Sequence, residues 1–332
     1  MASAQRIAFI FPGQGSQEPG MGREIAGAFP EARRVFDEAN GLLGFDLARL
    51  CFEGPEAELS LTKNSQPAIF TVSIACLKAL LAAVPGLPVP IAAAGLSLGE
   101  FSAHVAAGSL SFADGLTLVR RRAESMQEAC DLVSSAMASI VGLSPETVGE
   151  ICAAQETRGV IGIANLNCPG QVVISGCVAA VEAAMEEAGR RGAQKVVRLQ
   201  VSGAFHSRLM KPAEERLREA VAAATISPPR YPVIANATGL PATDPEEIRG
   251  ALVRQLCAPV LWEKSVRFII GMKAGLFIEL GHGRVLSGLL RRIDRAQRAA
   301  NVGDLKGLER LRPALAADTG GATLCWRGRR RS

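Results

Sequence analysis

Residues 95–99 read Gly-Leu-Ser-Leu-Gly and place Ser97 between an apolar run and a segment compatible with a helix. The apolar run at 91–94 predicts a strand, and residues 100–105 predict the start of a helix. A serine on a sharp strand-to-helix turn is the pattern of a nucleophile elbow. The serine backbone is strained in such a turn and its neighbours approach closely, so side chains at 95 and 99 would clash. We therefore predict that Ser97 is a nucleophile and not part of an ordinary turn.

A serine nucleophile needs a base, and the chain has three histidines. His104 lies seven residues after Ser97 on the same expected helix, about 10 Å away, so we expect a surface or packed side chain there. His206 lies in a loop after the strand-like residues 195–201, and His282 lies in a glycine turn after an apolar run. The pattern favours His206 only slightly, so both histidines stay candidates on this ground. No acidic residue lies beside either one, which predicts a Ser-His pair without an evident third member.

An arginine on an apolar helix face is a further candidate. Residues 112–128 carry apolar side chains at the helical period, and Arg122 falls within that stripe, whereas Arg120 and Arg121 point the other way. A buried guanidinium is costly unless an anionic group meets it. Arg122 is therefore either half of an ion pair with an internal carboxylate or a fork for a substrate carboxylate, which guanidinium matches with two parallel hydrogen bonds.

Length and composition favour an α/β protein with a large core. Hydrophobic residues make up 48% of the 332 residues, and strand-like and helical patterns alternate, which fits one large domain with an insertion, or two domains. Residues 1–5 run directly into the apolar run at 7–11, so no signal peptide is predicted. The most membrane-like stretch, residues 67–84, is interrupted by Lys78 and predicts a buried helix. We expect a cytoplasmic protein that does not enter a membrane.

Cysteine usage and charge argue against several kinds of site. The eight cysteines are scattered, with no C-x-x-C pair and no accompanying histidine spacing, which predicts reduced thiols without disulfides or zinc. The net charge is +5, but residues 303–332 hold seven basic and three acidic residues, which leaves about +1 for the rest of the chain. This balance does not indicate nucleic acid binding. Residues 303–332 are predicted to be a basic, disordered tail.

Residues 132–200 have a topology that can be predicted from the pattern. Strands are expected at 138–141, 160–164, 171–175 and 195–201, with helices at 144–155 and 178–191. Ser144 and Pro145 fit the cap and the first turn of the first helix. The order β-α-β-β-α-β is the ferredoxin-like pattern. We therefore predict a ferredoxin-like subdomain at 132–200 that splits an α/β body into 1–131 and 201–302, with Ser97 before the insertion and His206 directly after it.

Several short motifs occur in an order that resembles one enzyme family. They are residues 11–17 (F-P-G-Q-G-S-Q), residues 95–100 (G-L-S-L-G-E), Arg122 with Met126 and Gln127, residues 167–171 (N-C-P-G-Q), residues 204–206 (A-F-H) and residues 253–256 (V-R-Q-L). The set resembles the malonyl-CoA:acyl carrier protein transacylase family of bacterial fatty acid synthesis over residues 6–295. The resemblance implies an α/β-hydrolase-like body with a ferredoxin-like insertion.

The resemblance also implies which residues react. Ser97 would be the nucleophile, and His206, in preference to His282, would be its base. Arg122 would bind the malonyl carboxylate. No metal or bound cofactor would be required, and the partners would be malonyl-CoA and acyl carrier protein.

The resemblance implies supporting roles for four more residues. Gln14 and Leu98 would offer backbone N–H groups to the oxyanion, and Gln255 would help to orient His206. Phe205 belongs to a motif that often reads H-A-F-H in malonyl-selective relatives, where this chain has glycine at position 203. The family usually has histidine before the nucleophile, where this chain has Leu96. We expect that departure to affect the polarity of the elbow and the rate.

The implied reaction moves malonyl from malonyl-CoA to Ser97 and then to the phosphopantetheine thiol of acyl carrier protein. A serine hydrolase or thioesterase acting on acyl-CoA is one alternative, and a non-catalytic homologue that binds carrier protein is another. Arg122 and the lack of an evident acidic triad member argue against the hydrolase, and Leu96 is a weak hint of the non-catalytic homologue. The sequence does not determine whether the carrier serves fatty acid or polyketide synthesis, nor the docking surface. We expect a monomer.

Overall fold

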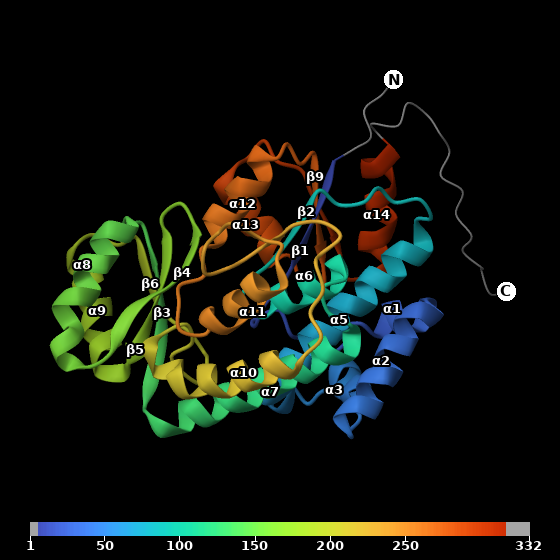
Figure 1. The fold of residues 1–332 in the computed structure, drawn as a ribbon. Helices are drawn as coiled ribbons and strands as arrows, with labels where there is room; N and C mark the ends of the chain where they lie inside the picture. The colour runs from blue at the N-terminus through green and yellow to red at the C-terminus, as the bar shows by residue number, and fades with distance from the viewer. Residues whose placement is uncertain (1–5, 317–332) are drawn as a thin grey trace.

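The computed structural model describes residues 6–316, which form a mixed α/β fold with two sheets surrounded by helices (Figure 1). The larger sheet has the strand order β10-β9-β1-β2-β7-β8. Its strands are β1 (Ile7–Phe11), β2 (Ala92–Gly95), β7 (Val233–Ile234), β8 (Pro241–Ala242), β9 (Leu276–Leu280) and β10 (Ala299–Val302). Neighbouring strands are parallel except for β7 and β8, which are antiparallel.

Helices bury both faces of the larger sheet. Side chains alternate along a strand, so Phe9 and Phe11 of β1 enter one core while Ala8 and Ile10 enter another on the opposite face. The helices that follow the early strands are α1 (Arg23–Ala28), α2 (Pro30–Leu43), α3 (Leu47–Glu53), α4 (Glu56–Leu59), α5 (Thr62–Ala83), α6 (Gly99–Ala107) and α7 (Phe112–Leu132). The later helices are α10 (Lys211–Ala223), α11 (Pro245–Arg254), α12 (Trp262–Gly271) and α13 (Val285–Ile293), with a short 3-10 turn at Arg208–Met210.

The expected buried helix at 67–84 lies within α5 except for its last residue, which caps the helix. By length and composition α5 is the one helix among residues 6–316 that could span a membrane, but 78% of its most apolar window is buried inside the molecule. Lys78, which interrupts the apolar run, is one of its exposed residues. The helix therefore supplies core packing next to the larger sheet.

The strands of the second sheet lie in residues 135–198, after α7. This sheet consists of β3 (Ser135–Val141), β4 (Ile161–Cys168), β5 (Gln171–Cys177) and β6 (Lys195–Arg198), in the order β4-β5-β3-β6 and antiparallel throughout. Two helices cover its outer face, α8 (Pro145–Gln155) and α9 (Val178–Arg190), with a 3-10 turn at Glu156–Arg158 (Figure 1). As predicted, Ser144 caps α8 by accepting from Thr147 N at 3.2 Å, and Pro145 begins the helix.

The prediction of a tail from residue 303 is wrong for its first part. Residues 305–316 form α14 (Leu305–Ala316), which packs beside β10. Leu308, Leu311 and Leu315 are buried, because their spacing of three and four residues places them on one helix face. The rest of the predicted tail, residues 317–332 with the basic end, lies outside the described residues, as do residues 1–5.

Candidate active site

Ser97 has the strained backbone that the elbow pattern predicts. Its φ is +53°, in the left-handed region that few residues other than glycine adopt. A Cβ at Gly95 would lie 1.9 Å from the backbone of Gly99, and a Cβ at Gly99 would lie 2.2 Å from Phe11 O. Both contacts are far below van der Waals distance, so both positions require glycine. The turn between β2 and α6 thereby holds the serine hydroxyl at the carboxyl end of the sheet.

His206 is the histidine that meets Ser97. Its Nε2 lies 2.8 Å from Ser97 Oγ, and its Nδ1 lies 2.6 Å from the main-chain oxygen of Gln255. A carbonyl can only accept, so Nδ1 carries the proton and Nε2 is free to accept from the serine hydroxyl. His282 instead pairs with Glu18 at 3.1 Å, and His104 is packed inside the protein on α6. Of the two candidate histidines, His206 is therefore the one that lies within hydrogen-bond distance of Ser97.

The environment keeps His206 neutral. Burial, reinforced by the positive charge of Arg122, lowers the pKa of the imidazole to about 4. At neutral pH the ring is therefore unprotonated and able to accept the serine proton. The φ of His206 is +58°, so His206, like Ser97, has left-handed backbone.

Arg122 is fully buried and also reaches the serine. Its Nη2 donates to Ser97 Oγ at 2.9 Å and to Gln255 Oε1 at 3.1 Å, and its Nη1 donates to Gln66 Oε1. Burial lowers the pKa of the guanidinium to about 9, so the group is still cationic at neutral pH. Within residues 6–316 no carboxylate lies within ion-pair distance of Arg122, which is held by neutral acceptors that an incoming anion could replace.

The two expected oxyanion donors lie on segments that pack against each other. A Cβ at Gly13 would lie 2.4 Å from Leu96 O, so the loop that carries Gln14 runs directly along the elbow. The Gln14 side chain is held by hydrogen bonds to α5. Leu98 immediately precedes α6, where backbone N–H groups have no partner within the helix. The two segments that carry Gln14 and Leu98 therefore both lie next to the serine turn.

Gln255 contacts the base through its backbone and not through its side chain. Its main-chain oxygen accepts from His206 Nδ1, whereas its side-chain amide accepts from Arg122 and donates to Glu100 Oε2 at 2.9 Å. Its amide nitrogen also lies 3.4 Å from Ser97 O. Phe205, the residue before His206, is buried at the same loop.

The sequence interpretation missed three polar residues around the serine: Gln66, Glu100 and Asn236. Asn236 Oδ1 accepts from Ser97 N at 2.6 Å, and Asn236 Nδ2 donates to Gly95 O at 2.7 Å. Glu100 is buried one helical turn after the nucleophile, and burial raises the pKa of its carboxyl to about 7. Its place in the motif was visible in the sequence, but its partners come from loops more than 130 residues away.

Comparison with known proteins identifies the family. The acyl transferase domain model matches residues 8–315. The chain belongs to the acyl transferase family. It is 45% identical over 305 residues to the malonyl CoA-acyl carrier protein transacylase of Bacillus subtilis, which covers 92% of this chain and 95% of that protein.

Solved structures of the family share the whole fold. The malonyl CoA-acyl carrier protein transacylase of Coxiella burnetii superposes with a TM-score of 0.90 at 36% identity, covering 95% of this chain and 99% of that one. A malonyl-transacylase in complex with its type II polyketide synthase acyl-carrier protein superposes with a TM-score of 0.89 at 40% identity, covering 92% and 98%. The mixed α/β architecture of this chain is therefore that of the acyl transferase family.

Two departures from the motifs expected of the acyl transferase family have visible surroundings. Leu96 packs against the apolar cluster between the larger sheet, α12 and α13, so it extends a hydrophobic core. A Cβ at Gly203 would lie 2.1 Å from Cys130 Sγ, so the space that a side chain would need at position 203 is filled by α7. Neither residue contacts the Ser97–His206 pair through a hydrogen bond.

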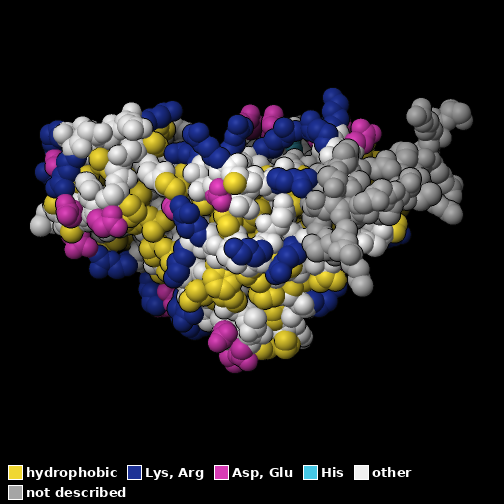
Figure 2. All heavy atoms as spheres, turned by 90° about the horizontal axis from the view of Figure 1, so that it is seen from above, with side chains coloured by type: hydrophobic (Ala, Val, Ile, Leu, Met, Phe, Trp, Pro, Cys, Tyr) yellow, Lys and Arg dark blue, Asp and Glu magenta, His cyan; other side chains and the backbone are white. Residues whose placement is uncertain are grey.

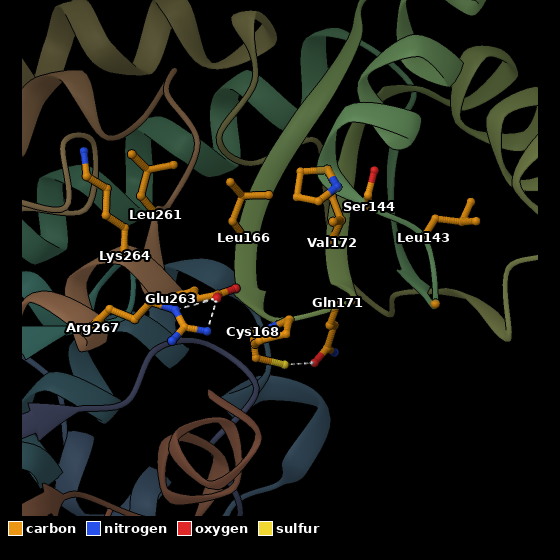
Figure 3. A pocket seen from close by; sticks show the side chains of 14 residues that line it. Leu143, Ser144, Leu166, Cys168, Gln171, Val172, Leu261, Glu263, Lys264 and Arg267 are labelled. Carbon is orange, nitrogen blue, oxygen red and sulfur yellow. Dashed lines mark hydrogen bonds and ion pairs between the residues drawn. The ribbon is translucent and has the colours of Figure 1, made fainter. Parts of the chain in front are cut away.

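A separate pocket lies where the second sheet meets α12 (Figure 3). It encloses about 630 Å3 and is lined by apolar side chains that include Leu143, Leu166 and Leu261. Glu263 and Arg267 form an ion pair at its edge. None of Ser97, Arg122 or His206 lines this pocket, so its size does not make it the reaction site of an acyl transferase.

The face seen from above in Figure 2 carries many basic side chains. Lys and Arg residues are spread over it with Asp and Glu between them. Arg291 and Arg292 are exposed near the end of α13, and Arg292 donates to Gln171 at 2.8 Å. Because the charges are dispersed, this face alone does not define a docking surface for an acidic carrier.

Proposed function

We propose that this chain transfers malonyl from malonyl-CoA to the phosphopantetheine thiol of acyl carrier protein through an ester on Ser97. One observation carries the proposal: Ser97 Oγ lies within hydrogen-bond distance of both His206 Nε2 and Arg122 Nη2. The first contact provides a base for the nucleophile. The second places a buried cation where an acyl group attached to the serine would carry its own carboxylate.

In the first half of the reaction, His206 Nε2 accepts the Ser97 proton as Oγ attacks the thioester carbonyl of malonyl-CoA. The backbone N–H groups of Gln14 and Leu98 stabilise the tetrahedral oxyanion. The C–S bond then breaks, and the sulfur leaves as coenzyme A thiol with the proton held by His206. Malonyl stays on Ser97 with its free carboxylate against Arg122.

The second half runs the same steps with a different acceptor. His206 removes the proton of the phosphopantetheine thiol, and the thiolate attacks the seryl ester. The ester C–O bond breaks, and His206 returns the proton to Ser97 Oγ. The name of the family member solved with its acyl-carrier protein supports this acceptor. Phe205, which directly precedes the base, is our proposed contributor to acyl selectivity.

We further infer that the molecule consists of an α/β-hydrolase-like body and an inserted ferredoxin-like subdomain at 132–200. The order β4-β5-β3-β6 supports this, since it places the first strand of the insertion between the third and the fourth, with both helices on one face. The body then comprises 1–131 and 201–302, extended by α14. A cytoplasmic location is part of the same proposal.

Mapping the acyl group after brief exposure to malonyl-CoA tests the function. Intact-mass analysis should show one malonyl group per chain, peptide mapping should place it on the Ser97 peptide, and acyl carrier protein should discharge it. The Ser97→Ala variant should show neither step. A Ser97→Ala protein that transfers malonyl at the normal rate would refute the proposal, and an ester that turns over equally fast without carrier protein would identify a hydrolase.

A further inference from the structure

Glu100 is a fully buried carboxylate beside the nucleophile that the proposed chemistry leaves without a task. It lies in the first turn of α6, three residues after Ser97, and its side chain has no access to solvent. A buried carboxylate is costly unless hydrogen bonds or opposite charge compensate it. The hydrogen bonds that Glu100 accepts therefore indicate its role.

One partner of Glu100 fixes the backbone of the nucleophile. Glu100 Oε2 accepts from the main-chain N–H of Asn236 at 2.9 Å. The side chain of the same asparagine accepts from Ser97 N at 2.6 Å and donates to Gly95 O at 2.7 Å. Asn236 thus ties together the strand end and the strained serine, and Glu100 holds Asn236 in place.

The other partner of Glu100 fixes the base. The same oxygen, Oε2, accepts from Gln255 Nε2 at 2.9 Å. Gln255 is the residue whose main-chain oxygen lies 2.6 Å from His206 Nδ1 and so sets the tautomer and the ring orientation. Gln255 ends α11, at a point where the chain leaves regular structure, so its side-chain anchor helps to define where its carbonyl points.

The contacts also join Glu100 to the substrate arginine. Gln255 Oε1 accepts from Arg122 Nη2 at 3.1 Å while Gln255 Nε2 donates to Glu100, so one amide bridges the buried guanidinium and the buried carboxyl group. Within the described part of the chain, Glu100 is the acidic group whose charge acts on Arg122. Nucleophile, base and arginine therefore converge on one carboxylate.

We propose that Glu100 is a positioning residue that sets the Ser97–His206 geometry, with one carboxylate oxygen holding the serine turn through Asn236 and the histidine through Gln255. The inference rests on the proposed roles of Ser97 and His206. In a hydrolase triad the acid binds the histidine directly. Here Glu100 would act on His206 indirectly, through Gln255. No proton moves to or from Glu100 in this role.

Two substitutions at position 100 separate this role from simple packing. Glu100→Leu has a similar volume but removes the carboxylate oxygen that accepts from Asn236 N and Gln255 Nε2. The rate constant for malonyl transfer to Ser97 should therefore fall about 10²-fold, as for a displaced reacting group. Glu100→Gln keeps one acceptor oxygen, which is weaker because it is neutral, so its loss should be about tenfold or less. Both rate constants are measured in single turnovers at saturating malonyl-CoA, with the final amplitude giving the fraction of folded chain.

A fluorophosphonate, which labels base-activated serines and carries no carboxylate, reports the Ser97–His206 pair independently of Arg122. Labelling should slow in the same order, wild type, Glu100→Gln, then Glu100→Leu. The matched control is Glu279→Leu, which removes another fully buried carboxylate, one that caps α13 through Leu286 N and Ser287 N. This control should lose stability but keep the wild-type rate constant per folded chain.

Three results would overturn the inference about Glu100. The first is a Glu100→Leu variant with the wild-type rate constant. The second is a Glu100→Leu variant in which only the final amplitude, and so the fraction of folded chain, is reduced. The third is slow malonyl transfer with an unchanged rate of fluorophosphonate labelling. If wild-type protein is not acylated on Ser97 at all, the proposed function itself has failed. Acylation of the wild type with no effect at position 100 rejects only the inference.

Discussion

Ser97 Oγ contacts two side chains, His206 and Arg122, for which we propose different roles, and the charge of Arg122 acts on His206. Arg122 lies close enough to lower the pKa of His206, because a guanidinium disfavours an imidazolium beside it. A malonyl carboxylate bound at Arg122 would neutralise that charge. The base would then be stronger with an acidic acyl group in the site than with a neutral one, so the same arginine would act on both binding and proton transfer.

His206 should be the essential histidine. His206→Ala removes the group 2.8 Å from Ser97 Oγ, so the acylation rate should fall about 10²–10⁴-fold, the usual range for a positioned base. His282→Ala should change the rate far less, because His282 pairs with Glu18 at the surface. Single-turnover measurements with malonyl-CoA provide the comparison. A larger loss in His282→Ala than in His206→Ala would show that the base is assigned wrongly.

Arg122 should decide between malonyl and neutral acyl groups. Arg122→Ala should raise the barrier for malonyl by about 2–5 kcal/mol, the range for truncating one member of a buried charge pair. That corresponds to roughly 30-fold to several-thousand-fold in kcat/KM. Acetyl-CoA has no carboxylate, so its loss should be much smaller and its relative use should rise. Competition between the two thioesters, measured as the product ratio on carrier protein, gives the result.

The neighbouring Arg121 supplies the control for Arg122. It lies on the same helix but faces solvent, so Arg121→Ala should keep the wild-type product ratio. An unchanged malonyl preference in folded Arg122→Ala would mean that the buried guanidinium serves the structure and that selectivity resides elsewhere.

At the scale of elements, the sequence predicted those helix starts and turns that depend on a few adjacent residues. Ser144 and Pro145 mark the start of α8, and the glycines at 95 and 99 mark the turn before α6, because caps and tight turns depend on a few adjacent residues. The network under the serine could not be predicted in this way. Glu100 binds Asn236, which lies on a loop 136 residues away, and only the folded sheet brings the two together.

Helix α6 contains a second buried titratable group, His104, that should make stability depend on pH. Burial lowers the pKa of His104 from its usual 6.5 to about 3. In the unfolded chain the imidazole binds a proton below its ordinary pKa, while the folded protein keeps it neutral. The stability that this difference contributes is therefore fully present above 6.5 and is lost as the pH falls toward the folded value.

His104→Leu removes this titration. The wild type and the variant should therefore differ in how steeply the free energy of unfolding changes with pH. Between about pH 6 and pH 4, the free energy of unfolding should fall less steeply in the variant, by about 1.4 kcal/mol per pH unit. Glu100 and His206 titrate in both proteins, so their contributions cancel in the comparison. Urea unfolding across this range measures the two slopes, and equal slopes would show that His104 is not held neutral by burial.

At the scale of the whole molecule, the C-terminal helix belongs to the core. The charge count of residues 303–332 suggested a tail, but the leucines at 305, 308, 311 and 315 follow the helical period, and that signal was present in the sequence. The net charge of residues 303–332 as a whole did not indicate the amphipathic helix at residues 305–316. Periodicity is the better guide there because burial depends on which face each side chain occupies.

Leu311→Ala tests whether α14 contributes to global stability. Leu311 is fully buried, so its truncation should lower the free energy of unfolding by about 2–5 kcal/mol, the usual cost in a core. Leu132→Ala serves as the control, since that leucine is 70% exposed and should change stability by no more than about 0.5 kcal/mol. Denaturant midpoints compare the three proteins, and equal midpoints would place α14 outside the cooperative unit.

The order of strands in the larger sheet has a consequence for synthesis on the ribosome. Strand β1 lies between β2 and β9, yet β9 begins at Leu276, roughly 270 residues later. At about 5–20 residues per second, the first strand waits roughly 15–50 s for its second neighbour. Throughout that interval one edge of an apolar strand, Ile7–Phe11, stays unpaired and open to pairing with other chains. Nascent chains of this protein should therefore need a bound chaperone until β9 has emerged from the ribosome.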